Sequence, residues 1–99
     1  MNDQYDINRI IKLGVINDWE LIDHQINIGL LIFKRGTSKI NVYYTRMTVA
    51  SIVDHPTQGR NQMYRRHVSL NILEKIFINP RLHTRPDDEY HGYHYRKYA

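Results

Sequence analysis

Apolar residues recur at helical spacing in two segments, one near each end of the chain. In Ile7–Leu13 they follow Asp6, which can cap a helix, and they precede Gly14, which can end one. In Leu70–Ile78 they follow Ser69, a second candidate N-cap. We predict a short N-terminal helix and one main C-terminal helix, which the following Asn-Pro pair stops.

Between the two helices the pattern changes to that of β-strands. The segment Trp19–Val68 holds short runs rich in β-branched and aromatic residues. Gly29 marks either a bulge or a join between strands, and Gly36–Ser38 marks a hairpin. The run Lys39–Val53 is longer than a typical strand, so we expect a bend or turn at Arg46–Thr48. The sheet is predicted to be antiparallel, with three to five strands.

Two further segments lack a helical pattern. Asp54–Asn61 gathers Asp, Pro, Gly and Asn residues, which predicts a loop, and Met63–Val68 is a candidate short strand. After Leu82 there is almost no aliphatic side chain. We therefore predict one compact α+β domain over residues 1–82, in which the main helix packs on one face of the sheet. Residues 83–99 form a polar, tyrosine- and histidine-rich tail, either flexible or ordered by a partner.

Composition narrows the function classes. The chain has 99 residues, 41% of them hydrophobic, which suits one small domain. The absence of cysteine excludes disulfides, thiol catalysis and cysteine-ligated zinc. No apolar run approaches the roughly 20 residues of a membrane span, and the N-terminus lacks the apolar stretch of a signal peptide. We expect a soluble intracellular protein, in cytoplasm or nucleus, without a membrane partner.

The net charge of +4 is unevenly distributed. Residues 34–86 carry ten Lys or Arg against two acids, whereas residues 1–33 carry two against five and residues 87–99 two against three. A basic middle between acidic ends is the electrostatic footprint of a polyanion binder. The competing interpretation is a solvated surface on which an arginine pairs with an acid such as Asp54, Glu74 or Asp23.

The basic middle combines arginines with tyrosines on predicted strands. Arginine matches phosphate oxygens in pairs, and an exposed tyrosine on a sheet stacks against the bases of a single strand. The main helix has no recognition-helix pattern. We therefore predict a nucleic-acid-binding domain, with RNA or single-stranded DNA favoured over duplex DNA. Its candidate contact residues are Lys39, Tyr43, Arg46, Arg60, Tyr64, Arg65, Arg66, His67, Arg81 and Arg85.

Two other function classes stay open. Tyrosine and arginine are enriched in protein interfaces, so the same surface suits a protein-binding adaptor or inhibitor, of viral or mobile-element kind. The second class is a small metal-independent, toxin-like ribonuclease, which needs a base, an acid and a cation at the phosphate. Its candidate groups are His55 and His67 as base, His83 and Tyr64 as acid, and Arg65 and Arg66 as cation. No spacing-specific catalytic motif is present, so no catalytic residue is assigned.

The tail histidines are weak metal-ligand candidates. His91 and His94 would share a face only in a helix, and Gly92 between them argues against one. We predict no metal and no cofactor. A homodimer through an exposed sheet edge is compatible with the sequence, although no residue pattern specifies it.

Overall fold

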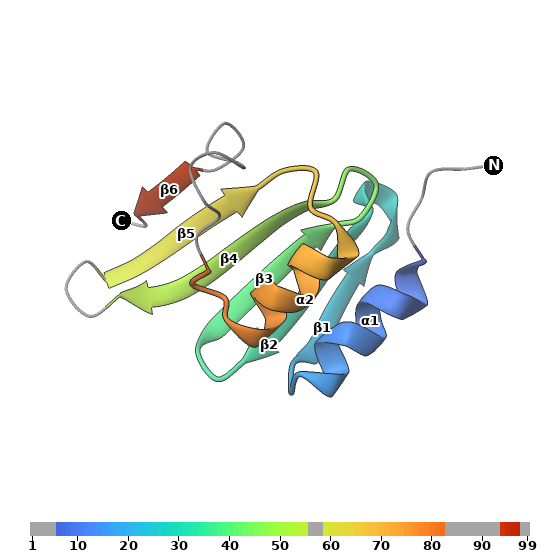
Figure 1. Cartoon of the computed structure of the whole chain (residues 1–99), viewed down its shortest axis with the longest axis horizontal. Helices are drawn as coiled ribbons and strands as arrows, with labels where there is room; N and C mark the ends of the chain where they lie inside the picture. Colours follow the sequence, from blue (N-terminus) through green and yellow to red (C-terminus); the bar gives the residue numbers. More distant parts are fainter. Residues whose placement is uncertain (1–5, 56–58, 83–93, 98–99) are drawn as a thin grey trace.

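The chain forms an antiparallel meander with two helices on one side of the sheet (Figure 1). The structure is a computed structural model, and it describes residues 6–55, 59–82 and 94–97. Strand order in the sheet follows the sequence, so each strand pairs with the next. The elements are α1 (Ile7–Ile16), β1 (Glu20–Gln25), the 3-10 turn η1 (Ile26–Ile28), β2 (Leu30–Arg35), β3 (Ser38–Tyr43), β4 (Thr48–His55), β5 (Gly59–Arg65), α2 (Leu70–Ile78) and β6 (His94–Lys97).

The predicted α+β class is confirmed. Strands β1 to β5 fill the segment in which the sequence predicted three to five antiparallel strands. A sixth strand, β6, pairs with β5 from within the segment expected to be a tail. Strand pairing uses backbone groups, which every residue carries. A polar segment can therefore form a strand although its sequence lacks the apolar pattern from which a strand is predicted.

The helices differ from their prediction in one respect. Helix α2 spans the predicted residues, and the Ser69 hydroxyl accepts a hydrogen bond from the backbone N–H of Ile72 at 3.1 Å. Helix α1 continues through Gly14 to Ile16 and is ten residues long, one more than α2, so the contrast of one main and one short helix is wrong. A Cβ at Gly14 would lie 2.6 Å from a ring carbon of Phe33. Gly14 therefore permits close packing of the helix on the sheet and does not end it.

The connections between the first four strands lie where the sequence predicted joins and turns. Gly29, at φ 66°, is the join between η1 and β2, and Gly36, at φ 62°, lies in the β2–β3 hairpin. The long apolar run turns at residues 44–47, which separate β3 from β4. Both glycines take the left-handed conformation that other residues adopt at a cost.

The predicted loop over Asp54–Asn61 is wrong at both of its ends, and its middle, residues 56–58, lies outside the described residues. Strand β4 continues to His55 and β5 starts at Gly59, and these two residues are partners in the ladder. Turn-forming residues such as Asp54 and Gly59 therefore occupy strand positions in the ladder. Strand β5 also starts earlier and ends earlier than the predicted short strand, because the chain leaves the sheet after Arg65.

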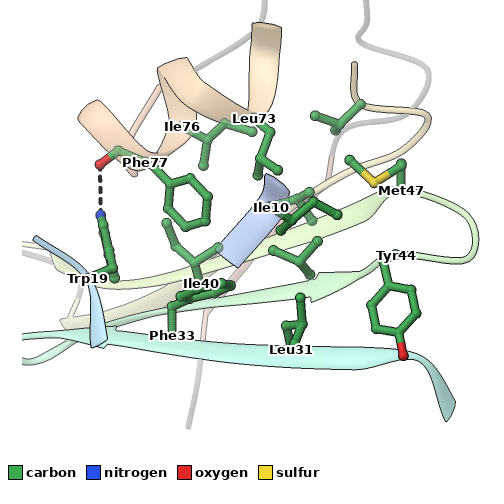
Figure 2. Close-up of a cluster of buried hydrophobic side chains, with 13 residues drawn as sticks. Ile10, Trp19, Leu31, Phe33, Ile40, Tyr44, Met47, Leu73, Ile76 and Phe77 are labelled. Atoms are coloured by element: carbon green, nitrogen blue, oxygen red, sulfur yellow. Dashed lines mark hydrogen bonds between the residues drawn. The ribbon is translucent and has the colours of Figure 1, made fainter. Parts of the chain in front are cut away.

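The core lies between the helices and one face of the sheet (Figure 2). The rings of Phe33 and Phe77 meet edge to face, with centroids 5.0 Å apart. The Trp19 indole N–H donates to the carbonyl of Phe77 at 2.8 Å. The Arg35 guanidinium lies 4.4 Å from the centroid of the Trp19 ring and donates to the carbonyls of Asn17 and Phe77. These contacts fasten the C-terminal ends of both helices to strand β2.

Candidate nucleic-acid interface

Strand register divides the sheet residues between two faces. On the face under the helices, Leu31, Val42 and Val49 lie side by side across three strands, and all three are buried. Because side chains alternate along a strand, the residues between them point to the opposite side. We call that side, which neither described helix covers, the open face (Figure 1). The polar and aromatic residues that register assigns to it are Lys34, Lys39, Asn41, Tyr43, Thr48, Asp54, Arg60, Gln62 and Tyr64. The same face is buried at its centre, where Ala50, Ile52 and Gln62 are at most 8% exposed.

Two of the predicted tyrosines share the open face. Tyr43 lies on β3 opposite Thr48, and Tyr64 lies on β5 opposite Ala50, so one strand separates them. Adjacent strands lie about 4.8 Å apart and residues along a strand rise about 3.3 Å, which puts these backbones about 10 Å apart across the sheet and about 7 Å along it. Both residues are half-buried, so part of each remains accessible to solvent. They form two separate stacking platforms and not one stacked pair.

A pair of lysines lies on the open face toward the β2–β3 hairpin. Lys39 was predicted, and register puts Lys34 directly opposite it. Like charges in directly opposed positions repel each other, and an anion bound between them relieves that repulsion. Lys34 was missed in the sequence, although the two-residue turn at Gly36-Thr37 fixes the register that pairs it with Lys39.

At one end of the sheet, three predicted residues lie exposed on two adjacent loops. Arg46 lies in the β3–β4 turn, and Arg66 and His67 lie between β5 and α2. The two loops are joined by a hydrogen bond from the Val68 N–H to the Met47 carbonyl, 2.9 Å long. We call this region, defined by Arg46, Arg66 and His67, the arginine end. It adjoins the part of the open face that carries the two tyrosines.

At the other end, around the β2–β3 and β4–β5 hairpins, the two arginines Arg60 and Arg81 are engaged within the protein. The Asp54 carboxylate accepts from the Thr37 hydroxyl and from Arg60, each at 3.0 Å. Arg60 also donates to the Thr37 carbonyl at 2.8 Å, and Arg81 donates to the Asp54 carbonyl. The hydrogen bonds from Thr37 and Arg60 lower the pKa of Asp54. We call this region, defined by Thr37, Asp54, Arg60 and Arg81, the aspartate end.

Arg65 is a structural residue, which corrects its prediction as a contact. Its side chain is 2% exposed and lies on the face under the helices, opposite Val49. The guanidinium donates to the Ser51 hydroxyl at 2.8 Å and to the carbonyls of Pro80 and Leu82. Burial requires these partners, and they leave the group no path to a ligand on the open face. For the same reason it is not the phosphate clamp of a ribonuclease.

Several remaining candidates lie outside the described residues. These are Arg85, His83, His91 and the side chains of His55 and His94. Within the described ranges, no three His, Cys, Asp or Glu side chains gather as metal ligands would. Neither described helix has the length and apolar character needed to span a membrane.

Comparison with known proteins adds no further constraint on the site. The chain matches no family model, no curated protein and no solved structure. The candidate interface therefore rests on three features of the molecule itself: the two tyrosines, the lysine pair and the arginine end.

Proposed function

We propose that this protein binds single-stranded nucleic acid, RNA or single-stranded DNA, across the open face of its sheet. The observation that carries the proposal is the joint location of Tyr43 and Tyr64 on a face that neither described helix covers, with Lys39 on the same face, four residues from Tyr43 along β3. Tyrosine rings on a sheet stack on unpaired bases, and the adjoining cations follow the phosphate backbone. A duplex hides its bases, so it would use the cations and not the rings.

A titration with a labelled oligouridylate of about 12 nucleotides, within the range of known single-strand sites, tests the proposal. At low salt we expect binding that weakens steeply as salt rises, since phosphate contacts release counterions. The Tyr43→Ala and Tyr64→Ala variants should each bind more weakly by about fivefold or more, because one base stack contributes about 1–3 kcal/mol.

Control variants separate these effects from general loss of charge or fold. Lys75→Ala removes an exposed lysine of α2, on the helix side of the sheet, and should leave affinity nearly unchanged. Circular dichroism should report the same fold for every variant. If the protein fails to bind the strand at low salt, or if the tyrosine variants bind as well as the parent, the proposal is wrong.

A protein-binding role is a second candidate, and a different surface favours it. Ile22 on the edge strand β1 and Ile26 and Ile28 in η1 are 43%, 73% and 54% exposed. The same strand carries the exposed acids Glu20 and Asp23, so it differs in charge from the open face. Exposed aliphatic groups at a sheet edge suit a protein partner better than a polyanion. A stable stoichiometric complex that forms without nucleic acid and is lost in Ile26→Asp would support this role.

A further inference from the structure

Both loops of the arginine end contain a residue in the left-handed backbone conformation that is not glycine. Met47 has φ 51° and His67 has φ 54°. Such residues are uncommon, and they persist where the surrounding structure holds them and where a site requires a fixed geometry. Burial explains Met47, because its side chain is 2% exposed and belongs to the core. His67 is exposed, so packing of its side chain does not explain its backbone.

The two loops share one arrangement, in which an exposed polar residue precedes a buried apolar anchor. Arg46 precedes Met47, and His67 precedes Val68, which is 4% exposed. The hydrogen bond between Val68 and Met47 ties the two anchors together. The backbone that carries Arg46 and Arg66 is therefore held by the core, and the loops need little further ordering when a ligand binds.

Each arginine follows a tyrosine of the open face along the chain. Arg46 comes three residues after Tyr43, and its N–H donates to the Tyr43 carbonyl at 3.3 Å. Arg66 comes two residues after Tyr64, where β5 ends. Within the described residues, neither arginine lies at ion-pair distance from an acid. Two tyrosine–arginine pairs thus occupy neighbouring positions at one end of the sheet, and no acid of the described ranges pairs with either guanidinium.

We propose that Arg46 and Arg66 form a preorganised phosphate clamp. The clamp holds the sugar–phosphate backbone at the point where a single strand leaves the tyrosines of the open face, so this inference rests on the proposed function. Each guanidinium presents a planar fork that fits two oxygens of a phosphodiester. His67 is a positioning residue, since its left-handed backbone directs the chain from Arg66 back into the core at Val68.

The salt dependence of strand binding distinguishes the clamp from the stacking platforms. Each phosphate contact to a single strand contributes about −0.7 to the slope of log K against log salt. The double variant Arg46→Ala/Arg66→Ala should therefore have a slope shallower by about 1.4. Tyr43→Ala/Tyr64→Ala should weaken binding while the slope stays unchanged. The matched control is Arg9→Ala/Lys75→Ala, which removes two exposed cations from the helices and should retain the parental slope.

A second measurement uses a phosphate compound without bases. In an NMR titration with inorganic tripolyphosphate, the backbone amides of Arg46, Arg66 and His67 should shift, and those of Arg60 and Arg81 should not. Absence of shifts at Arg46 and Arg66 would overturn the clamp even if the strand binds. A slope unchanged in the double arginine variant would overturn it while the proposed function stands. Absence of strand binding would refute the proposed function and, with it, the assignment of the clamp to a nucleic acid.

Discussion

The two ends of the sheet contain similar residue types and use them in opposite ways. At the aspartate end, Arg60 lies 3.0 Å from Asp54, and Arg81 donates to a backbone carbonyl. At the arginine end, Arg46 and Arg66 are exposed, without an acid at ion-pair distance among the described residues. A count of basic residues treats the two ends alike. The fold separates them, because among the described residues an acid lies within reach of the arginines at one end and not at the other.

The backbone of the two ends differs in the same sense. In the described part of the two hairpins of the aspartate end, the left-handed positions are Gly36 and Gly59, and a Cβ at either would meet nothing within 4 Å. These turns use the residue that takes the conformation at least cost. At the arginine end, Met47 and His67 adopt it without that freedom. We infer that the left-handed residues of the aspartate end close hairpins, whereas those of the arginine end hold loops that expose side chains to a ligand.

The largest expected effect comes from two arginines that are neighbours in sequence. Arg65→Met should lower the free energy of unfolding by about 3 kcal/mol, because the Ser51 hydroxyl and the carbonyls of Pro80 and Leu82 lose their buried donor. Arg66→Met, at an exposed position, should change it by less than about 0.5 kcal/mol. Urea denaturation of the two variants measures both.

In binding of a nucleic-acid strand, the substitution at Arg66 should have the larger effect of the two. Arg66→Met should make the salt slope shallower by about 0.7, whereas Arg65→Met, at a temperature where it remains folded, should keep the parental slope. Equal stability of the two variants would contradict the structural role of Arg65. A shallower slope in the Arg65 variant would contradict the distinction between buried and presented arginines.

Much of the fold was predictable from local sequence. The cap Ser69 and the helical spacing behind it identified α2, and the glycines at 29 and 36 marked real turns. The extension of α1 through Gly14 was not predictable, because Gly14 is required by close packing against Phe33, a residue 19 positions away in the sequence. Sequence patterns report local preference, and tertiary contacts override it where two elements approach closely.

The candidate site was predictable in part. Tyr43 and Tyr64 alternate with core residues, so the period of the strands was enough to suggest them for one face. The same alternation puts Arg65 and Arg66 on opposite faces, but the sequence does not show which face the helices cover, so it does not tell which arginine is buried. The ion pair between Arg60 and Asp54 likewise depends on the β4–β5 ladder, in which the two residues are partners. The turn-forming residues of that segment predicted a loop there instead.

A smaller effect is expected at His67. His67→Val should lower the free energy of unfolding by about 1–2 kcal/mol, because a β-branched residue adopts the left-handed conformation with strain. His67→Gly should be at least as stable as the parent, since glycine adopts it freely. If the backbone of His67 positions the clamp, the glycine variant should keep most of the strand affinity and the valine variant should lose it. Similar affinities of the two variants would assign His67 a merely local role.

The pH dependence at Asp54 is a smaller effect. Its pKa is lowered in the folded protein, so its contacts with Thr37 and Arg60 stabilise the fold above the ordinary value of 3.8. That contribution disappears as the pH falls through the lowered pKa, because the protonated carboxyl no longer attracts Arg60. Denaturation below about pH 3.8 should therefore narrow the stability difference between the parent and Asp54→Asn. A difference that does not change with pH would show that the carboxylate charge contributes nothing.

The smallest effect tests whether the aspartate end can be converted into a second arginine end. Asp54→Asn removes the acid that lies 3.0 Å from Arg60, on the side of the sheet that also carries Lys34 and Lys39. The released guanidinium can then reach the backbone of a strand on the open face, so the salt slope should steepen by at most about 0.7. Asp18→Asn, a turn position that asparagine tolerates at φ 71°, is the matched control for loss of one negative charge. If both variants change the slope equally, the gain is a property of net charge, and the pairing of Arg60 with Asp54 does not determine which end of the sheet can hold phosphate.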